Sequence, residues 1–336
     1  MRRLLGLILI VGLLVPVANS LAQDAVEYVL PEVDPLLVDG DIVTAGSSTV
    51  FPLSVAMVES FTEAGYGGEI TVDSIGSGAG YERFCVNAET DISNASRAIR
   101  EGELEACEES GRPAIEFRVG TDAMAVSVSV ENDFIGEDGL TVEQLQQIFS
   151  QGNNATWADI NEEWPAEAIL LYSPGTDSGT FDFFVEAIFE DLADEMGVEE
   201  PEELILEAGG IQLSEDDNIL VAGVADSPYA IGYFGYAYYL ENADVIKALP
   251  INAVAPSEES VEASGEEAYV LARPLFIYSS QSIMEEKPQV ADFINYYLTN
   301  VNEIVTEVGY FPASEAALNI AKANWCEAVG TCEMME

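Results

Sequence analysis

The sequence predicts an α/β protein of two lobes, each a mainly parallel sheet flanked by helices, with two strands crossing between the lobes. The first observation is a repeated order of short apolar strand, Gly/Ser loop and amphipathic helix, which is typical of layered α/β folds. The second is a pair of long apolar, β-rich runs at 123–130 and 269–279. Because these runs lie far apart in the chain, we interpret them as its two passages between lobes.

The first strand–loop–helix unit begins with a strand at 41–46 and a loop, SSTVFP. In the helix that follows, Leu53, Met57, Val58 and Phe61 recur at helical spacing. Two further units run through the loops GSGAG and PGTDSGT, and two more helices are expected at 290–301 and 314–325. In parallel sheets of this kind, ligands bind at the carboxyl ends of the strands.

The chain divides into a leader region and two lobes. Residues 1–23 contain two arginines, a short apolar run and small residues, the pattern of a secretory signal peptide. Residues 24–40 are acidic and broken by prolines, and we expect them to lie outside the fold. The crossings then predict a discontinuous first lobe, 41–122 with 273–336, and an inserted second lobe, 123–272. We expect a periplasmic or extracellular protein.

Four cysteines are compatible with disulfides in an exported protein. Three connectivities are possible. The simplest pairs neighbours along the chain, Cys85 with Cys107 and Cys326 with Cys332.

The charged residues exclude several function classes. The sequence has 61 Asp and Glu against 11 Lys and Arg, and it has no histidine. Without an imidazole there is no Ser-His-Asp triad, and no lysine lies in a Ser-x-x-Lys pattern, so we predict no catalytic residue. Zinc sites with His ligands are excluded too, and we predict no metal or cofactor. A formal net charge of −50 repels nucleic acid, and we interpret it as an adaptation for solubility.

Three Gly/Ser loops each precede a helix, whose first amides and positive dipole end attract an anion. The hydroxyl donors in these loops are Ser48, Thr49, Ser77, Ser178 and Thr180. For any one such loop, plain helix capping is the better explanation. Three in one chain favour an anion site.

Arg97 directly follows Ser96 at the end of a predicted strand, in a chain with few basic residues. One interpretation is a surface ion pair with one of the many acids. The other is a bidentate partner for a tetrahedral oxyanion, which a guanidinium fits well. Beside three anion-receptive loops, we favour the second.

Five segments together resemble the extracytoplasmic phosphate-binding proteins of ABC transporters, the PstS/SphX type. They are GSSTVFP, GSGAGYERFC, TDISNASR, LYSPGTDSGTFDFF and AIGYFGYAYY, in the family's order and over nearly the whole chain after residue 40. The resemblance implies a type II periplasmic-binding-protein fold that clamps inorganic phosphate between its lobes. It also implies a monomer that delivers phosphate to the permease subunits of a membrane transporter.

The resemblance also implies a set of ligand residues. From the first lobe these are Ser48, Thr49, Val50 and Ser77, and from the second lobe Ser178, Gly179 and Thr180. The chain departs from the family pattern by having Arg97 where many members have Asp, and by lacking an Arg shortly before Ser-Gly-Thr.

The missing Asp leaves open which group accepts the proton of HPO₄²⁻. Asp177 is our candidate, and capping of the following helix is its alternative role. Three other functions stay open: a receptor for sulfate or molybdate, a secreted hydrolase, and a surface protein without transport.

Overall fold

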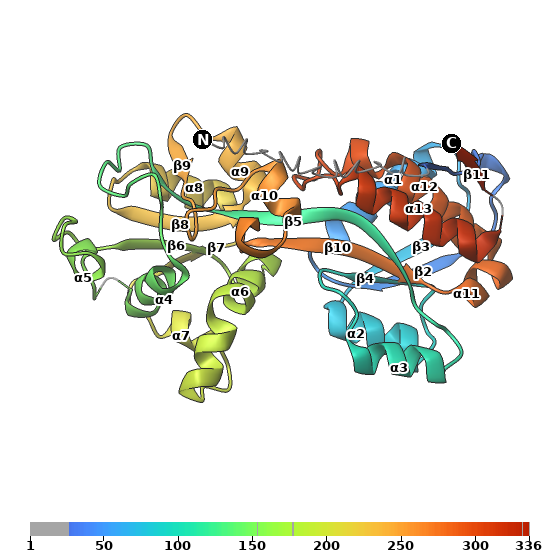
Figure 1. Cartoon of the computed structure of the whole chain (residues 1–336), viewed down its shortest axis with the longest axis horizontal. Coiled ribbons are helices and arrows are strands. Elements are labelled where there is room, and N and C mark those ends of the chain that lie inside the picture. The colour runs from blue at the N-terminus through green and yellow to red at the C-terminus, as the bar shows by residue number, and fades with distance from the viewer. Residues whose placement is uncertain (1–26, 153, 177, 331, 336) are drawn as a thin grey trace, which may run out of the picture.

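The computed structural model describes residues 27–152, 154–176, 178–330 and 332–335, and forms two lobes joined side by side (Figure 1). A nine-stranded mixed sheet runs through both lobes. Its strand order is β3 (Ile70–Ser74), β2 (Ile42–Gly46), β4 (Ile92–Ala95), β10 (Ala272–Ser279), β5 (Ile115–Ser129), β8 (Ala230–Gly235), β6 (Leu170–Pro174) and β7 (Gln212–Ser214), with β9 (Ile246–Ala248) paired to β5.

In the first lobe, β2 pairs in parallel with both β3 and β4. The helices of this lobe are α1 (Phe51–Glu63), α2 (Ser77–Tyr81), a π-helical turn (Glu82–Val86), α3 (Glu101–Glu109), α11 (Gln281–Glu286), α12 (Pro288–Ile304) and α13 (Glu315–Val329). Helices α1, α12 and α13 lie on one face of the sheet, and α2 and α3 on the other (Figure 1). The predicted apolar stripe of α1 is confirmed, since Leu53, Met57 and Phe61 are fully buried.

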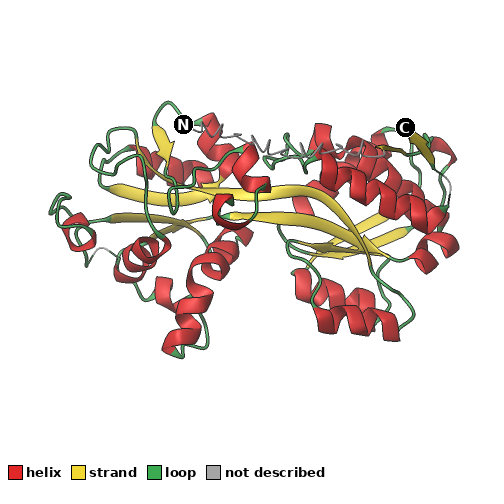
Figure 2. Ribbon diagram, viewed as in Figure 1, coloured by secondary structure: helices red, strands yellow, loops and turns green. Residues whose placement is uncertain are grey.

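In the second lobe, β6 pairs in parallel with β7 and β8. Its helices are α4 (Val142–Gln151), α5 (Trp157–Ile160), α6 (Gly179–Met196), α7 (Glu203–Leu206), α8 (Asp217–Ala225), α9 (Tyr236–Glu241) and α10 (Glu258–Glu262). Helices cover both faces of this sheet as well (Figure 2). The α/β class and the parallel strands within each lobe are therefore as predicted.

Strands β5 and β10 are the two crossing strands. They pair antiparallel from Ile115 and Ser279 in the first lobe to Ala123 and Ala272 at the second. Strand β5 is 15 residues long, and its second half pairs with β8 and β9. Each lobe has its own large hydrophobic core. Along β5, residues up to Val119 pack in the first core and residues from Ala123 on pack in the second.

One residue of the last part of the chain packs in the second core. Phe311, which the sequence assigns to the first lobe, exchanges two backbone hydrogen bonds of 2.9 Å with Thr121 on β5. Its ring lies 4.8 Å from that of Tyr236. The segment around Phe311 therefore forms a third contact between the lobes, beside the two crossing strands.

The expectation that the leader lies outside the fold is wrong for residues 27–40. Strand β1 (Glu27–Val29) pairs with β11 (Glu333–Met335), and Pro35, at the start of a 3₁₀ turn (Pro35–Leu37), is buried. The Pro31 carbonyl accepts a hydrogen bond from Asn295 Nδ2 at 2.9 Å. Apolar residues scattered among the acids and prolines also pack against the first core. Their spacing matches neither a helix nor a strand, so the sequence pattern does not predict this packing.

Both predicted disulfides are present, Cys85–Cys107 and Cys326–Cys332. The first joins the π-helical turn to α3, and the second joins α13 to the chain beyond it. The predicted signal peptide, residues 1–23, lies outside the described residues. Within the described residues, no helix has both the length and the apolar character needed to span a bilayer.

Candidate anion-binding site between the lobes

Three strand ends of the first lobe are held together by backbone hydrogen bonds. The carbonyl of Gly46, the last residue of β2, accepts from the amides of Ile75 and Gly76, both at 2.9 Å. The Ser47 amide donates to the Asn94 carbonyl on β4 at 2.9 Å. The loops after β2, β3 and β4 therefore share the carboxyl edge of the parallel strands, where ligands bind in such folds.

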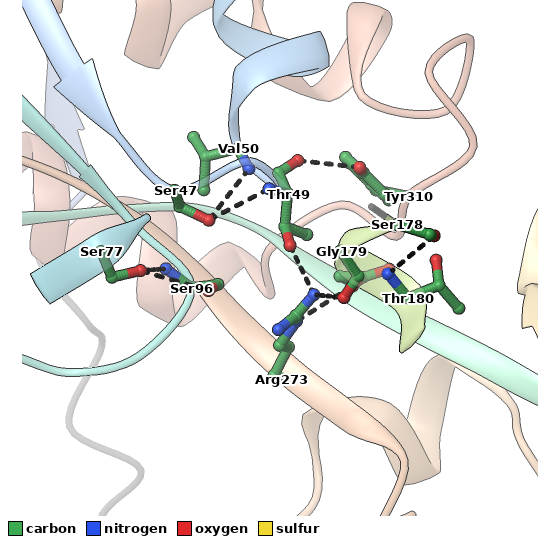
Figure 3. Close-up of polar contacts among 11 residues, drawn as sticks. Ser47, Thr49, Val50, Ser77, Ser96, Ser178, Gly179, Thr180, Arg273 and Tyr310 are labelled. Carbon is green, nitrogen blue, oxygen red and sulfur yellow. Dashed lines mark hydrogen bonds and ion pairs between the residues drawn. The ribbon is translucent and has the colours of Figure 1, made fainter. Parts of the chain in front are cut away.

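The loop after β2 is ordered by its first serine. Ser47 Oγ accepts hydrogen bonds from the amides of Thr49 at 3.2 Å and Val50 at 3.3 Å (Figure 3). An anion would therefore compete with Ser47 for the Val50 amide. The Ser48 and Thr49 hydroxyls approach Gly179 of the second lobe.

The loop of the second lobe begins α6. Ser178 is the N-cap residue, and its Oγ accepts a hydrogen bond from the Thr180 amide at 3.2 Å. A Cβ atom added to Gly179 would lie 3.1 Å from Ser48 Oγ and 3.2 Å from Thr49 Oγ1. Glycine therefore lets the two loops approach this closely without displacing either hydroxyl.

Arg273, on β10, connects the two loops (Figure 3). Its Nη2 donates to the Gly179 carbonyl at 3.0 Å and to Thr49 Oγ1. Its Nε donates to Asp122 Oδ2 at 3.1 Å, and its guanidinium lies 4.1 Å from the ring centre of Phe183. One side chain from a crossing strand thus contacts both lobes.

These loops border a cavity of about 280 Å³. Its lining includes Ser48 and Thr49 from the first lobe, Gly179 and Thr180 from the second, and Arg273 between them. Hydroxyls, a helix N-terminus and a guanidinium are the donors that bind oxyanions in proteins.

Two carboxyl groups and two phenols also line this cavity: Asp122, Asp217, Tyr238 and Tyr310. Burial raises the pKa of Asp122, although Arg273 opposes the shift. Burial also raises the pKa of Asp217 to about 6, and the neighbouring acids Asp216 and Glu215 add to the effect. The cavity therefore combines one guanidinium with two groups able to accept a proton from a ligand.

A larger cavity of about 550 Å³ lies beside α6 and α7. Its polar lining is mostly carboxylate, from Asp182, Glu186, Glu190 and Glu202. An anion would be repelled there, so size alone does not identify the site.

Ser77 and Ser96 bond to each other and do not line the interlobe cavity. Their hydroxyls are 3.3 Å apart, and Ser77 Oγ also accepts from the Ser96 amide at 3.1 Å. The pair fixes α2 against the end of β4, which is a structural role that sequence alone could not separate from ligand binding.

Arg97 is also absent from the cavity lining, because its guanidinium is paired elsewhere. Nη1 and Nη2 donate to the two carboxylate oxygens of Glu103 at 2.9 and 2.7 Å. The guanidinium also lies over the ring of Tyr81, 5.1 Å from its centre. This is the ion pair that stood as the alternative role of Arg97. Asp177, the candidate proton acceptor, lies outside the described residues.

Five polar residues of the cavity are not identified from the sequence: Asp122, Asp217, Tyr238, Arg273 and Tyr310. For Arg273 a signal existed, because an arginine within an apolar strand must be paired or bind a ligand. The others carry no local signal. Within the described residues, no group of three or more His, Cys, Asp or Glu is placed to hold a metal ion.

Comparison with known proteins shows the family. The protein-family model described as "PBP superfamily domain" matches residues 35–301 of this chain. The chain belongs to this superfamily. Two relatives of this PBP superfamily chain are the protein SphX of Synechocystis sp. and the phosphate-binding protein PstS of Staphylococcus saprophyticus. SphX is 38% identical over 83% of this chain and 80% of its own length. PstS is 30% identical over 81% of this chain and 80% of its own length.

A solved structure supports the same conclusion. The crystal structure of a possible phosphate-binding protein from Planctomyces limnophilus superposes with a TM-score of 0.73. It is 33% identical and covers 87% of this chain and 99% of its own. The resemblance to the PstS/SphX type is therefore confirmed, as is the two-lobed fold of the PBP superfamily.

Proposed function

We propose that this chain is an extracytoplasmic solute-binding protein that captures inorganic phosphate between its lobes for an ABC-type importer. The observation that carries the proposal is the cavity in which hydroxyls from one lobe face a helix N-terminus from the other. The names of the PstS relative and of the Planctomyces limnophilus structure point to the same ligand.

The proposed ligands are Ser48, Thr49, Gly179 and Thr180, which line the cavity. Ser178 acts with them by orienting the Thr180 amide. Val50 and Ser77 remain predictions from the family resemblance. Ser96, Arg97 and Asp177 remain predictions from the residues themselves. The lobe boundaries at 122/123 and 272/273 also remain a proposal. It is supported by β5, where Val119 packs in the first core and Ala123 in the second.

Phosphate fits this cavity better than sulfate for a chemical reason. HPO₄²⁻ carries a proton that it can donate to a carboxylate, whereas sulfate has none. Asp122 and Asp217 supply carboxyl groups at the cavity, so a fully ionised oxyanion would leave an acceptor unpaired and face like charge.

We further propose that the protein binds and releases its ligand without chemical turnover, as a monomer that docks to permease subunits. A sequence without histidine has no imidazole base for a hydroxyl nucleophile. The signal-peptide pattern of residues 1–23 supports export, and the formal net charge of −50 disfavours a nucleic-acid partner. We propose no cofactor.

Calorimetric titration of the ligand-free protein with phosphate, then with sulfate, tests the proposal. We expect 1:1 binding of phosphate in the micromolar range or tighter, undisturbed by excess sulfate. Equal or tighter sulfate binding would make the chain a receptor for another oxyanion. No heat with either anion would contradict the proposed function.

A further inference from the structure

Arg273 is a buried charge in an apolar strand. It is only 8% exposed and is followed by the apolar run Pro-Leu-Phe-Ile. Burying a guanidinium is costly unless it is paired, and here Asp122, its register partner on β5, accepts from Nε at 3.1 Å. Because Asp122 bonds only Nε, the opposite edge of the guanidinium is left for other acceptors.

The opposite edge reaches the binding loops. Nη2 contacts Thr49 Oγ1 in the first lobe and the Gly179 carbonyl in the second. Within the described residues, Nη1 makes no hydrogen bond, and Arg273 lines the cavity. The ring of Phe183 at 4.1 Å holds the plane of the guanidinium in this orientation.

Arg97 differs in how its charge is used. Both of its Nη atoms donate to Glu103, so the edge that would grip an oxyanion is occupied by a carboxylate. An anion could bind Arg97 only after this bidentate pair is broken. Arg273 has no such requirement, since its carboxylate partner occupies Nε alone.

We propose that Arg273, in place of Arg97, supplies the positive charge that holds the oxyanion, from a position where one guanidinium contacts a binding loop of each lobe. The inference rests on the proposed function and deepens it. The anion binds at Nη1, next to the Thr49 hydroxyl that Nη2 fixes.

The test must avoid leaving a buried carboxylate unpaired, because Arg273→Met alone may fail to fold. We therefore compare Asp122→Asn with the double variant Asp122→Asn/Arg273→Met. In both proteins residue 122 is a neutral amide, so the comparison removes Arg273 without leaving a buried carboxylate unpaired. Arg97→Met is the matched control. Each protein is titrated with inorganic phosphate, and circular dichroism with thermal melting verifies that it is folded.

We expect removal of Arg273 to weaken phosphate binding about 100-fold, as loss of a desolvated charge-assisted contact does. Arg97→Met should change it less than about threefold, because neither Arg97 nor its partner Glu103 lines the cavity. Arg273→Lys should bind about tenfold more weakly than the unaltered chain with its melting temperature retained, because it keeps the charge and loses the fork.

Two outcomes would overturn the inference alone. One is phosphate binding that survives the double substitution and is lost in Arg97→Met. The other is phosphate affinity in Arg273→Lys equal to that of the unaltered chain. This second outcome decides the question even if the double variant does not fold. If the unaltered chain binds no phosphate, the proposed function fails first, and this inference with it.

Discussion

Gly179 lies where the loop before α6 of the second lobe approaches the loop after β2 of the first. An added Cβ would lie 3.1 and 3.2 Å from the hydroxyl oxygens of Ser48 and Thr49, which is tighter than ordinary contact. Alanine is otherwise acceptable at this first position of α6, because helices favour it over glycine. The requirement for glycine therefore comes from the opposite lobe and not from the helix.

We predict that Gly179→Ala lowers phosphate affinity about tenfold, the cost of a small overpacking, without lowering the melting temperature. Calorimetry measures the affinity, and small-angle scattering measures whether the lobes open. Gly102→Ala is the control, since it also lies in a helix and an added Cβ there has no neighbour within 4 Å. Equal affinities in both variants would contradict close contact between the loops.

Asp217 carries a second residue-scale prediction. Its pKa is raised from 3.8 to about 6, first by burial and then by Asp216 and Glu215. The folded protein thus holds this proton more tightly than the unfolded chain. The resulting stability is fully present below pH 3.8 and is lost as the pH rises through about 6.

Asp217→Asn removes the cost of ionising a buried carboxyl group, so we expect the variant to melt above the unaltered protein at pH 7. At pH 4, where the folded protein keeps Asp217 protonated, we expect the variant to melt at an equal or lower temperature. Melting curves across this interval measure the difference. The exposed Asp244 offers the matching substitution, Asp244→Asn, as the control for loss of one charge. A difference that does not change with pH would mean that Asp217 is not buried as described.

At the scale of elements, α6 shows how one residue can serve both fold and site. Ser178 caps the helix through the Thr180 amide. The sequence could predict the helix, its start and the hydroxyl, because capping follows a local pattern. Whether that hydroxyl is also a ligand depends on the facing lobe, which local pattern does not describe.

Two substitutions at Ser178 separate these roles. Alanine removes both the cap and the hydroxyl, and should cost about 1 kcal/mol of stability. Glycine caps nearly as well and should cost only a few tenths of that. If the hydroxyl binds phosphate, both variants lose affinity by about tenfold, while only Ser178→Ala melts earlier. Full affinity in Ser178→Gly would assign Ser178 to capping alone.

Local sequence pattern predicts elements that depend on neighbours in the chain, and it does not predict contacts between distant residues. Strand–loop–helix units such as β2–α1 have apolar periodicity and a glycine stop, so their order follows from nearest neighbours in the chain. The pairing of Arg273 with Asp122 spans 151 residues and depends on the register of β5 and β10. The pairing of Arg97 with Glu103, six residues on, is closer in the chain, yet the sequence gives no sign that Glu103 takes both Nη atoms.

The packing of residues 27–40 was missed for a related reason. Short apolar side chains such as Leu30 and Val33 contact the first core, and the amide of Tyr28 donates to Asn319 Oδ1 at 2.9 Å. The contact of Tyr28 with Asn319 spans 291 residues, and that of Pro31 with Asn295 spans 264. Composition alone describes the segment as acidic and proline-broken, which is equally typical of a free leader.

At the scale of the whole molecule, the charge opposes the ligand. The formal net charge of −50 produces a repulsive field for an anion approaching from solution. Inside the cavity, fixed donors and Arg273 act at contact distance, where salt screens little. Affinity and association rate should therefore depend on salt differently.

We expect the association rate for phosphate to rise several-fold between about 0.01 M and about 0.15 M salt, as the Debye length falls from about 30 to about 8 Å. The dissociation rate should change little, because it depends on contacts inside the closed cavity. Stopped-flow fluorescence measures both, with Trp157, Trp164 and Trp325 as intrinsic probes. Since chloride could compete for the cavity, the series is repeated with a bulky organic anion. An association rate that falls with salt in both series would mean that the field at the cavity entrance is positive, and that the acidic surface lies too far from the entrance to affect the anion's approach.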